Sequence, residues 1–297
     1  MVASDGGDTV KNGGLTVKLS GSKGEALLAK DSAEVPEGTV SDAYDLVLLG
    51  DTESPVTLTM DAPQSEEGTD VRIKVGLPYV DTEGKEDFLW VPLDTAQNGN
   101  TVTAEVDPTE YEGAVDGLRH DGNGVYTDGS EGFGERIMES AGKKKKSREA
   151  VYTYRILQDS AYCVKSGEGH FSVNIPVEMF NKAEAVVKRQ LRQEDAIRLG
   201  DDLEALLAGY KKDFPRDTRS KWPIPVEYTS DKDMAGMYGG SRRQNGCLFY
   251  INYNKLAGSY KDGGKYDTES VRLYHTLAHE MFHFIQMEYT NPLLSAV

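Results

Sequence analysis

Apolar and polar residues alternate in short runs between residues 14 and 106. A period of two residues is typical of a β-strand with one buried face. Clusters of Gly, Pro, Asp and Ser separate the runs, and no stretch in this part of the chain keeps a helical period for more than a turn or two. The pattern predicts strands over Leu15–Leu19, Tyr44–Leu49, Val56–Met60, Val71–Val75, Phe88–Val91 and Thr101–Val106.

Half a dozen strands separated by turn residues predict a small, all-β, immunoglobulin-like sandwich over residues 14–115. Residues 1–13 are rich in Gly, Asp and Asn and are predicted to be a flexible N-terminal tether. Residues 116–149 combine Gly-rich turns with the run Lys143–Lys146, so we predict a linker between domains. The lysines are expected on a solvated loop or hairpin tip, because no aromatic residue is interleaved with them.

Oxygen-bearing side chains in this linker raise the alternative of a calcium loop. Asp121, Asn123 and Asp128 are closely spaced donors. An EF-hand needs an oxygen ligand at its fifth position and glycine at its sixth, where this chain has Val125 and Tyr126. Plain turns are therefore the favoured interpretation, with bound calcium as the weaker alternative.

From residue 150 onwards the pattern alternates between strands and helices and predicts an α+β domain over 150–297. Apolar residues recur at three- and four-residue steps between Lys182 and Tyr210, which predicts one or two helices, with a possible break at Gly200–Asp201. A last helix is expected from Asp267 or Thr268 to about Tyr289. Strands are predicted over Val151–Leu157, His170–Ile175, Ile224–Tyr228 and Cys247–Tyr253.

Charge and cysteine content narrow the class of protein. The 297 residues carry a formal net charge of −16, which repels nucleic acid and anionic lipid. No window is apolar enough for a membrane-spanning helix. The acidic composition and the 16 tyrosines favour an extracellular or cell-surface location. Cys163 and Cys247 are too few for a disulfide scaffold; buried thiols are favoured, and a single bridge remains the alternative.

The predicted last helix contains the pattern His-Glu-x-x-His at His279, Glu280 and His283. Residues i and i+4 lie one turn apart on the same face of a helix, so both imidazoles can reach one tetrahedral zinc ion. Glu280 projects roughly 100° further round the helix, where a carboxylate can take a proton from a zinc-activated water. The spacing predicts a Zn²⁺ site in which Glu280 is the general base.

A chance match to this pattern is the alternative, expected in about one chain in a hundred. Apolar residues surround the pattern on almost every side, so the helix is expected to be buried, where unsatisfied imidazoles would be costly. His275 lies one turn earlier but cannot be a third ligand. Its distance from His283 along the axis is about 12 Å, whereas two nitrogens on one zinc can be at most about 4 Å apart. We expect His275 to pack or to support a ligand.

The segment Thr276–Gln286 resembles the active-site helix of gluzincin-type zinc metallopeptidases, in which aromatic and aliphatic residues flank the same pattern. The order of strands and helices from about residue 150 is also similar. The resemblance implies that His279 and His283 bind zinc, that Glu280 is the catalytic base, and that the strand at Leu248–Tyr253 is an edge strand that pairs with a peptide substrate.

In gluzincins a glutamate on a later helix supplies the third zinc ligand, and a later Tyr or His stabilises the oxyanion. Neither has a counterpart before Val297, so we expect this chain to hold the N-terminal half of a zincin-like domain, to lack the third ligand and to be inactive alone. The predicted function is a zinc metallopeptidase acting on peptides or proteins. Two alternatives remain: a surface binding protein with a vestigial peptidase-like domain, and a zinc hydrolase with a non-peptide substrate.

Overall fold

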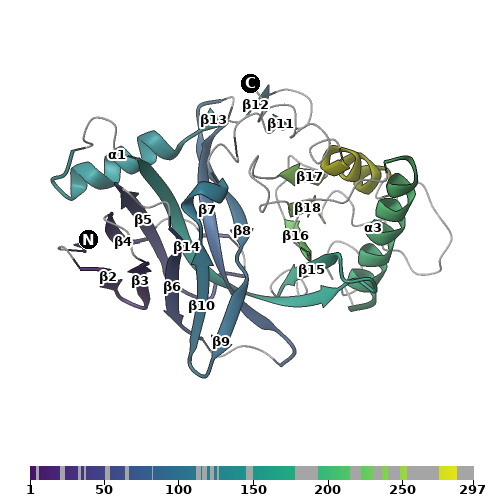
Figure 1. Ribbon diagram of the computed structural model, residues 1–297, viewed down its shortest axis with the longest axis horizontal. Helices are drawn as coiled ribbons and strands as arrows, with labels where there is room; N and C mark the ends of the chain where they lie inside the picture. Colours follow the sequence, from purple (N-terminus) through teal and green to yellow (C-terminus); the bar gives the residue numbers. More distant parts are fainter. Residues whose placement is uncertain are drawn as a thin grey trace. The chain divides into compact units, whose positions relative to one another are not determined.

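Antiparallel β-sheets arranged like a sandwich make up most of the described chain (Figure 1). The computed structural model describes residues 1–4, 7–20, 24–32, 35–36, 38–50, 54–63, 67–81, 83–111, 115, 119–120, 124–125, 127–144, 150–177, 193–214, 222–229, 236–239, 248–252 and 274–285. The chain divides into two units. Unit 1 comprises Met1–Arg119 and Gly124–Ser160, and unit 2 comprises His120–Asn123 and Ala161–Val297.

One sheet of unit 1 has five antiparallel strands in the order β2-β3-β6-β10-β9. Their bounds are β2 (Thr9–Asn12), β3 (Leu15–Leu19), β6 (Val56–Asp61), β10 (Thr101–Val106) and β9 (Thr95–Asn98). Apolar side chains at every second position of β3, β6 and β10 are buried, and the residues between them are more exposed. The period of two predicted these three central strands, because one face of the sheet is buried.

The other strands of unit 1 form a second group. It contains β1 (Val2–Ala3), β4 (Glu25–Asp31), β5 (Ala43–Leu49), the first part of β14 (Val151–Lys165), β7 (Asp70–Val80), β8 (Glu86–Pro92) and β13 (Thr127–Asp128). The path β1-β4-β5-β14 continues through β7, which pairs with β14, β8 and β13. The 3-10 helix η1 (Pro108–Tyr111) follows β10, and β11 (Arg119–His120) and β12 (Gly124–Val125) form a small separate sheet.

Strand β5 is buried along its whole length, so both faces of its sheet are covered. On one side, the Tyr44 hydroxyl accepts a hydrogen bond of 2.9 Å from Gly14 N in the β2-β3 turn. On the other side, helix α1 (Ser130–Ser140) places Phe133 and Ile137 in one apolar cluster with Val47. Unit 1 is therefore a two-sheet sandwich with a helix on its outer face (Figure 1).

The predicted linker over 116–149 is wrong for residues 130–140, which form α1. One of the glycines that suggested turns, Gly134, is required instead by helix packing. A Cβ at Gly134 would lie 2.6 Å from Thr153 Cγ2, so glycine lets the helix approach β14 closely. Asp128 Oδ1 accepts a 2.7 Å hydrogen bond from Ser130 N, which begins the helix, so this residue forms a turn at the helix start. Asp121 and Asn123 lie outside the described residues.

The predicted tether over 1–13 is also wrong for the residues that form β1 and β2. Strand β1 pairs with β4, and β2 pairs with β3. The Ser4 hydroxyl accepts a 3.0 Å hydrogen bond from Ala26 N, and Val10 is 3% exposed. Glycine and aspartate dominate the composition of this segment, but single apolar residues such as Val10 are enough to bury a short strand beside a longer one.

A buried arginine links several strands of unit 1. Arg155 on β14 donates from Nε to Asp45 Oδ1 at 2.8 Å and forms an ion pair with Asp31. Its guanidinium lies 4.4 Å from the Phe88 ring centroid and 5.5 Å from that of Phe133. Burial raises the pKa of Asp45, and the hydrogen bond from Arg155 opposes that shift. The arginine thus offsets the cost of burying two carboxylates.

Unit 2 is built on a mixed sheet. The last residues of β14 pair antiparallel with β15 (Phe171–Pro176), which is parallel to β16 (Ile224–Thr229); β16 is parallel to β18 (Leu248–Asn252), and β17 (Gly236–Gly239) is antiparallel to β18. The prediction that 248–253 is an edge strand is therefore wrong, because β18 lies between β16 and β17. Among the described strands, β17 ends the sheet.

Helix α3 (Gln193–Asp213) and a helix over 274–285 pack on this sheet. Residues 182–192 of the predicted helix lie outside the described part of the chain. The expected break at Gly200–Asp201 is wrong, because α3 runs through it. A Cβ at Gly200 would lie 3.1 Å from Ser166 Cβ, so this glycine also marks a close approach. No described helix is long and apolar enough to cross a membrane.

The boundary between the units falls inside β14, not near residue 149 as predicted. Residues 151–156 of this strand pair with β5, and residues 161–165 pair with β15. One strand thus contributes to both units, which no change of composition marks in the sequence. Cys163 lies half-buried on β14, and Cys247, the partner in the alternative of a single bridge, lies outside the described residues.

A pair of glycine substitutions in α1 tests the close approach of this helix to β14. Gly134→Ala should lower the free energy of unfolding by about 1–3 kcal/mol, because its methyl group collides with Thr153. Gly132→Ala is the matched control: its Cβ would lie 3.8 Å from the nearest side-chain atom, and it should stabilise the helix by about 0.5–1 kcal/mol. Urea unfolding of both variants measures the difference, and equal effects would contradict the close approach.

Candidate metal centre

The helix over 274–285 carries the His-Glu-x-x-His residues on an amphipathic surface. Its buried side chains belong to one apolar cluster with β15, β16 and α3. Tyr274, His275, His279 and Phe282 are exposed, so the expectation of a helix buried on almost every side is wrong. The apolar composition of the helix therefore predicted more burial than the structure has: the Phe282 side chain, for example, is 43% exposed. The buried members of the helix in this cluster are Leu277, Met281, Phe284 and Ile285.

The two imidazoles of the pattern converge. The Nε2 atoms of His279 and His283 lie 3.0 Å apart, and the ring planes are inclined by 88° with centroids 4.5 Å apart. Two nitrogens bound to one tetrahedral zinc at 2.0–2.1 Å would lie about 3.3 Å from each other. The side chains of His279 and His283 therefore present their ring nitrogens at nearly the separation that a shared zinc ion requires.

Glu280 lies next to this pair in a different environment. It is 7% exposed, whereas His279 is exposed and His283 is half-buried. A carboxylate next to a metal site and mostly removed from bulk water is suited to accept a proton from a water molecule held there. The burial of Glu280 is thus compatible with the role predicted for it.

His275 does not join the pair. Its side chain is exposed one turn before His279, and the axial distance of about 12 Å to His283 excludes a common ion. Among the residues that the structure describes, no three His, Cys, Asp or Glu side chains form a group suited to a metal. The described part of the chain therefore offers two candidate nitrogen ligands, His279 and His283.

Glu227, the most deeply buried acidic side chain near the helix in the sheet, faces the other way. Ile224 and Val226 of β16 belong to the apolar cluster under the helix, and side chains alternate along a strand. Glu227 therefore points to the opposite face, where its Oε1 accepts a 2.6 Å hydrogen bond from Asn174 Nδ2. It is not a candidate for the third ligand.

Aromatic side chains hold the helix from the side of α3. The Tyr210 hydroxyl donates a 3.2 Å hydrogen bond to Ala278 O, directly before His279, and its ring lies 6.4 Å from that of Phe282. The Trp222 ring lies 6.2 Å from Phe284, directly after His283. Contacts at Ala278, Phe282 and Phe284 thus flank both imidazoles and restrict rotation of the helix.

A polar cluster joins α3 to the β14-β15 turn. Glu204 accepts hydrogen bonds from His170 N at 3.0 Å and from the Ser166 hydroxyl, and its Oε2 lies 2.8 Å from His170 Nδ1. The His170 ring packs edge-on against Trp222 with centroids 4.5 Å apart. This network connects the turn to the tryptophan that touches the site helix. Its residues are far apart in sequence, so no local pattern predicted it.

Tyr210 could have been found from the sequence. It continues the row of Leu203, Leu206 and Leu207 at helical spacing, and a tyrosine on the buried face of a helix needs a partner for its hydroxyl. The identity of that partner depends on a residue 68 positions later, which spacing within α3 cannot reveal.

A search against models of known protein families and a search of curated protein sequences both give no match to this chain. The functional assignment therefore rests on the geometry of the chain's own residues.

Zinc binding by histidine variants tests the pair of ligands. His279→Ala and His283→Ala should each lower zinc affinity by at least about 100-fold, because each removes one nitrogen from the metal. His275→Ala is the matched control, an exposed histidine on the same helix, and should keep the affinity of the unchanged protein. Competition titration with a chromogenic chelator measures all three. Equal losses in the three variants would show that the metal is bound nonspecifically.

The hydroxyl of Tyr210 is expected to position the ligands. Tyr210→Phe keeps the ring but removes the hydrogen bond to Ala278 O, and should cost about 0.5–1.5 kcal/mol of stability. It should also lower zinc affinity several-fold, while Tyr274→Phe, an exposed change on the same helix, should alter neither. Chemical unfolding and metal titration check both effects. A stability loss at unchanged zinc affinity would leave Tyr210 with a packing role only.

Proposed function

We propose that the chain is a zinc-dependent hydrolase of the metallopeptidase type, with His279 and His283 as metal ligands and Glu280 as the general base. The observation that carries this proposal is the convergence of the two Nε2 atoms at 3.0 Å. The buried carboxylate of Glu280, the residue after His279, supports it. Both sequence searches are without a match, so the gluzincin resemblance adds only the local pattern around these three residues.

The proposed chemistry divides between the metal and the protein. Zinc, when bound by the two imidazoles, would lower the pKa of a water molecule and polarise the carbonyl group of the substrate. Glu280 would accept the proton of the attacking water and later deliver it to the departing amine. The 7% exposure of Glu280 limits competition from bulk water for that proton. His279, which is exposed, would leave the metal accessible to a substrate.

The arrangement of unit 2 supports a zincin-like domain. The mixed sheet, the long helix α3 and the helix with the proposed metal ligands share one apolar cluster. The order of these elements along the chain is the one that the resemblance implies. The substrate strand, which the sequence assigned to 248–253, is instead proposed to be β17, because this strand ends the sheet among the described strands. An extended peptide could add to it by main-chain hydrogen bonds. For unit 1, the two antiparallel sheets support the proposed immunoglobulin-like sandwich.

Replacing the proposed base separates binding from catalysis. Glu280→Gln should keep the zinc affinity within about threefold and lower the rate of peptide hydrolysis by about 100- to 10,000-fold, because the amide cannot accept the proton. Glu139→Gln, the same change at an exposed site on α1, should leave both unchanged. Because this chain alone is expected to lack the third ligand, hydrolysis is assayed with the zinc-loaded protein extended at its C-terminus, using a library of quenched fluorescent peptides.

Three outcomes would contradict the proposal. Hydrolysis that persists in Glu280→Gln would remove this residue from the reaction. Zinc bound at the two histidines without hydrolysis of any peptide would favour the alternative of a binding protein that keeps a peptidase-like helix. Hydrolysis of ester or amide substrates but not of peptides would favour a non-peptide substrate.

A further inference from the structure

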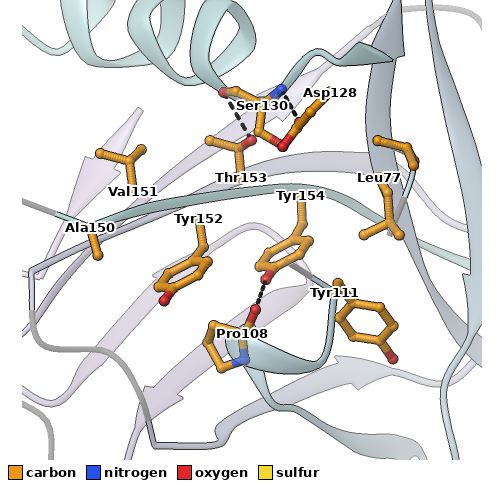
Figure 2. Close-up of a pocket in the computed structure, with 11 residues that line it drawn as sticks. Leu77, Pro108, Tyr111, Asp128, Ser130, Ala150, Val151, Tyr152, Thr153 and Tyr154 are labelled. Atoms are coloured by element: carbon orange, nitrogen blue, oxygen red, sulfur yellow. Dashed lines mark hydrogen bonds between the residues drawn. The ribbon is translucent and has the colours of Figure 1, made fainter. Parts of the chain in front are cut away.

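Unit 1 contains a cavity of about 220 Å³ that the proposed metal chemistry does not use. It lies where β14, β7, η1 and the start of α1 meet, entirely within unit 1 (Figure 2). Three tyrosines dominate one part of its wall, and Asp128 and Ser130 border another (Figure 2). A cavity with aromatic walls and a few polar groups is the usual form of a small-molecule site.

The tyrosine rings are held in place by neighbouring groups. Tyr152 and Tyr154 project from the same side of β14, because they are two residues apart (Figure 2). The Tyr154 hydroxyl donates a 3.3 Å hydrogen bond to Pro108 O, and the Tyr111 ring lies edge-on to that of Tyr154 with centroids 6.4 Å apart. The cavity is thus lined by aromatic side chains that are largely preorganised on a strand and a short helix.

The charges around these rings are negative. Burial raises the pKa of Tyr111, and Glu110 and Asp107 raise it further. Burial likewise raises the pKa of Tyr154, with added contributions from neighbouring tyrosines, Asp107 and Asp128. Both phenols therefore stay neutral near pH 7. None of the described residues that line the cavity is basic. An anionic ligand would be repelled, and a cation would be attracted.

We propose that this cavity binds a small organic ammonium ion. Tyrosine faces attract cations through their quadrupole, and this attraction increases when the cation is partly removed from water. The carboxylate of Asp128 and the protein's net charge of −16 favour the same sign of ligand. Alkyl groups on the nitrogen would contact Leu77, Pro108 and the rings, which a hydrated metal ion could not do. The proposal does not depend on the metal centre of unit 2.

Two probes of the same shape test the charge requirement. Choline carries a quaternary ammonium group, and 3,3-dimethylbutan-1-ol is its neutral carbon analogue. Titrations of the full chain, followed by NMR and by tyrosine fluorescence, should show saturable binding of choline that is about tenfold or more tighter than that of the alcohol. Equal affinities would overturn the ammonium proposal, and the absence of saturable choline binding would overturn it as well.

Variants of the lining residues test whether choline binds in this cavity. Tyr152 is half-buried, so it can be changed with the least risk to the fold. Tyr152→Leu should weaken choline binding by about tenfold, and Tyr152→Phe should stay within about threefold because the ring remains. Asp128→Asn should weaken binding while keeping the hydrogen bond from Ser130 N, since the asparagine Oδ1 can also accept it. Asp8→Asn, outside the lining, is the charge-matched control. Unchanged binding in Tyr152→Leu would place the site elsewhere and overturn the assignment.

Discussion

The apolar face of the helix over 274–285 determines where the candidate chemistry can occur. Leu277, Met281 and Phe284 are completely buried against β15, β16 and α3. With that face fixed, a helix of 3.6 residues per turn has to present His279 and His283 together on its open side. Contacts of Tyr210 and Trp222 with the same helix oppose its rotation. The convergence of two ring nitrogens is therefore a consequence of hydrophobic packing, and the metal would bind to side chains that are already in position.

Both units contain glycines whose role is close packing and not a turn. Gly134 in α1 and Gly200 in α3 both suggest turns in the sequence, yet both lie inside helices that approach a neighbouring segment too closely for a side chain. Helix α1 thereby covers the face of β5 that points away from the five-stranded sheet. The aromatic cavity lies beside the start of this helix, so the same segment that sequence composition assigns to a linker shapes a candidate binding site.

The sequence predicted those features that depend on local periodicity. Strands with one buried face, such as β3, β6 and β10, follow from alternation, and the convergence of the His279 and His283 rings follows from a four-residue spacing. Features that depend on long-range contacts were not predictable: the burial of β2 beside β3, the division of β14 between two units, and the position of β18 inside its sheet. The bond from Tyr210 to Ala278 belongs to the same class, since its partner is set by the tertiary fold.

X-ray absorption spectroscopy of the zinc-loaded chain measures the central claim directly, because it reports the atoms bound to the metal without requiring turnover. We predict a four-coordinate zinc ion with only nitrogen and oxygen neighbours at about 2.0–2.1 Å and the outer-shell scattering of two imidazoles. That scattering should be lost in the double variant His279→Ala, His283→Ala. Sulfur neighbours at about 2.3 Å, or an imidazole signal that survives the double substitution, would contradict the account.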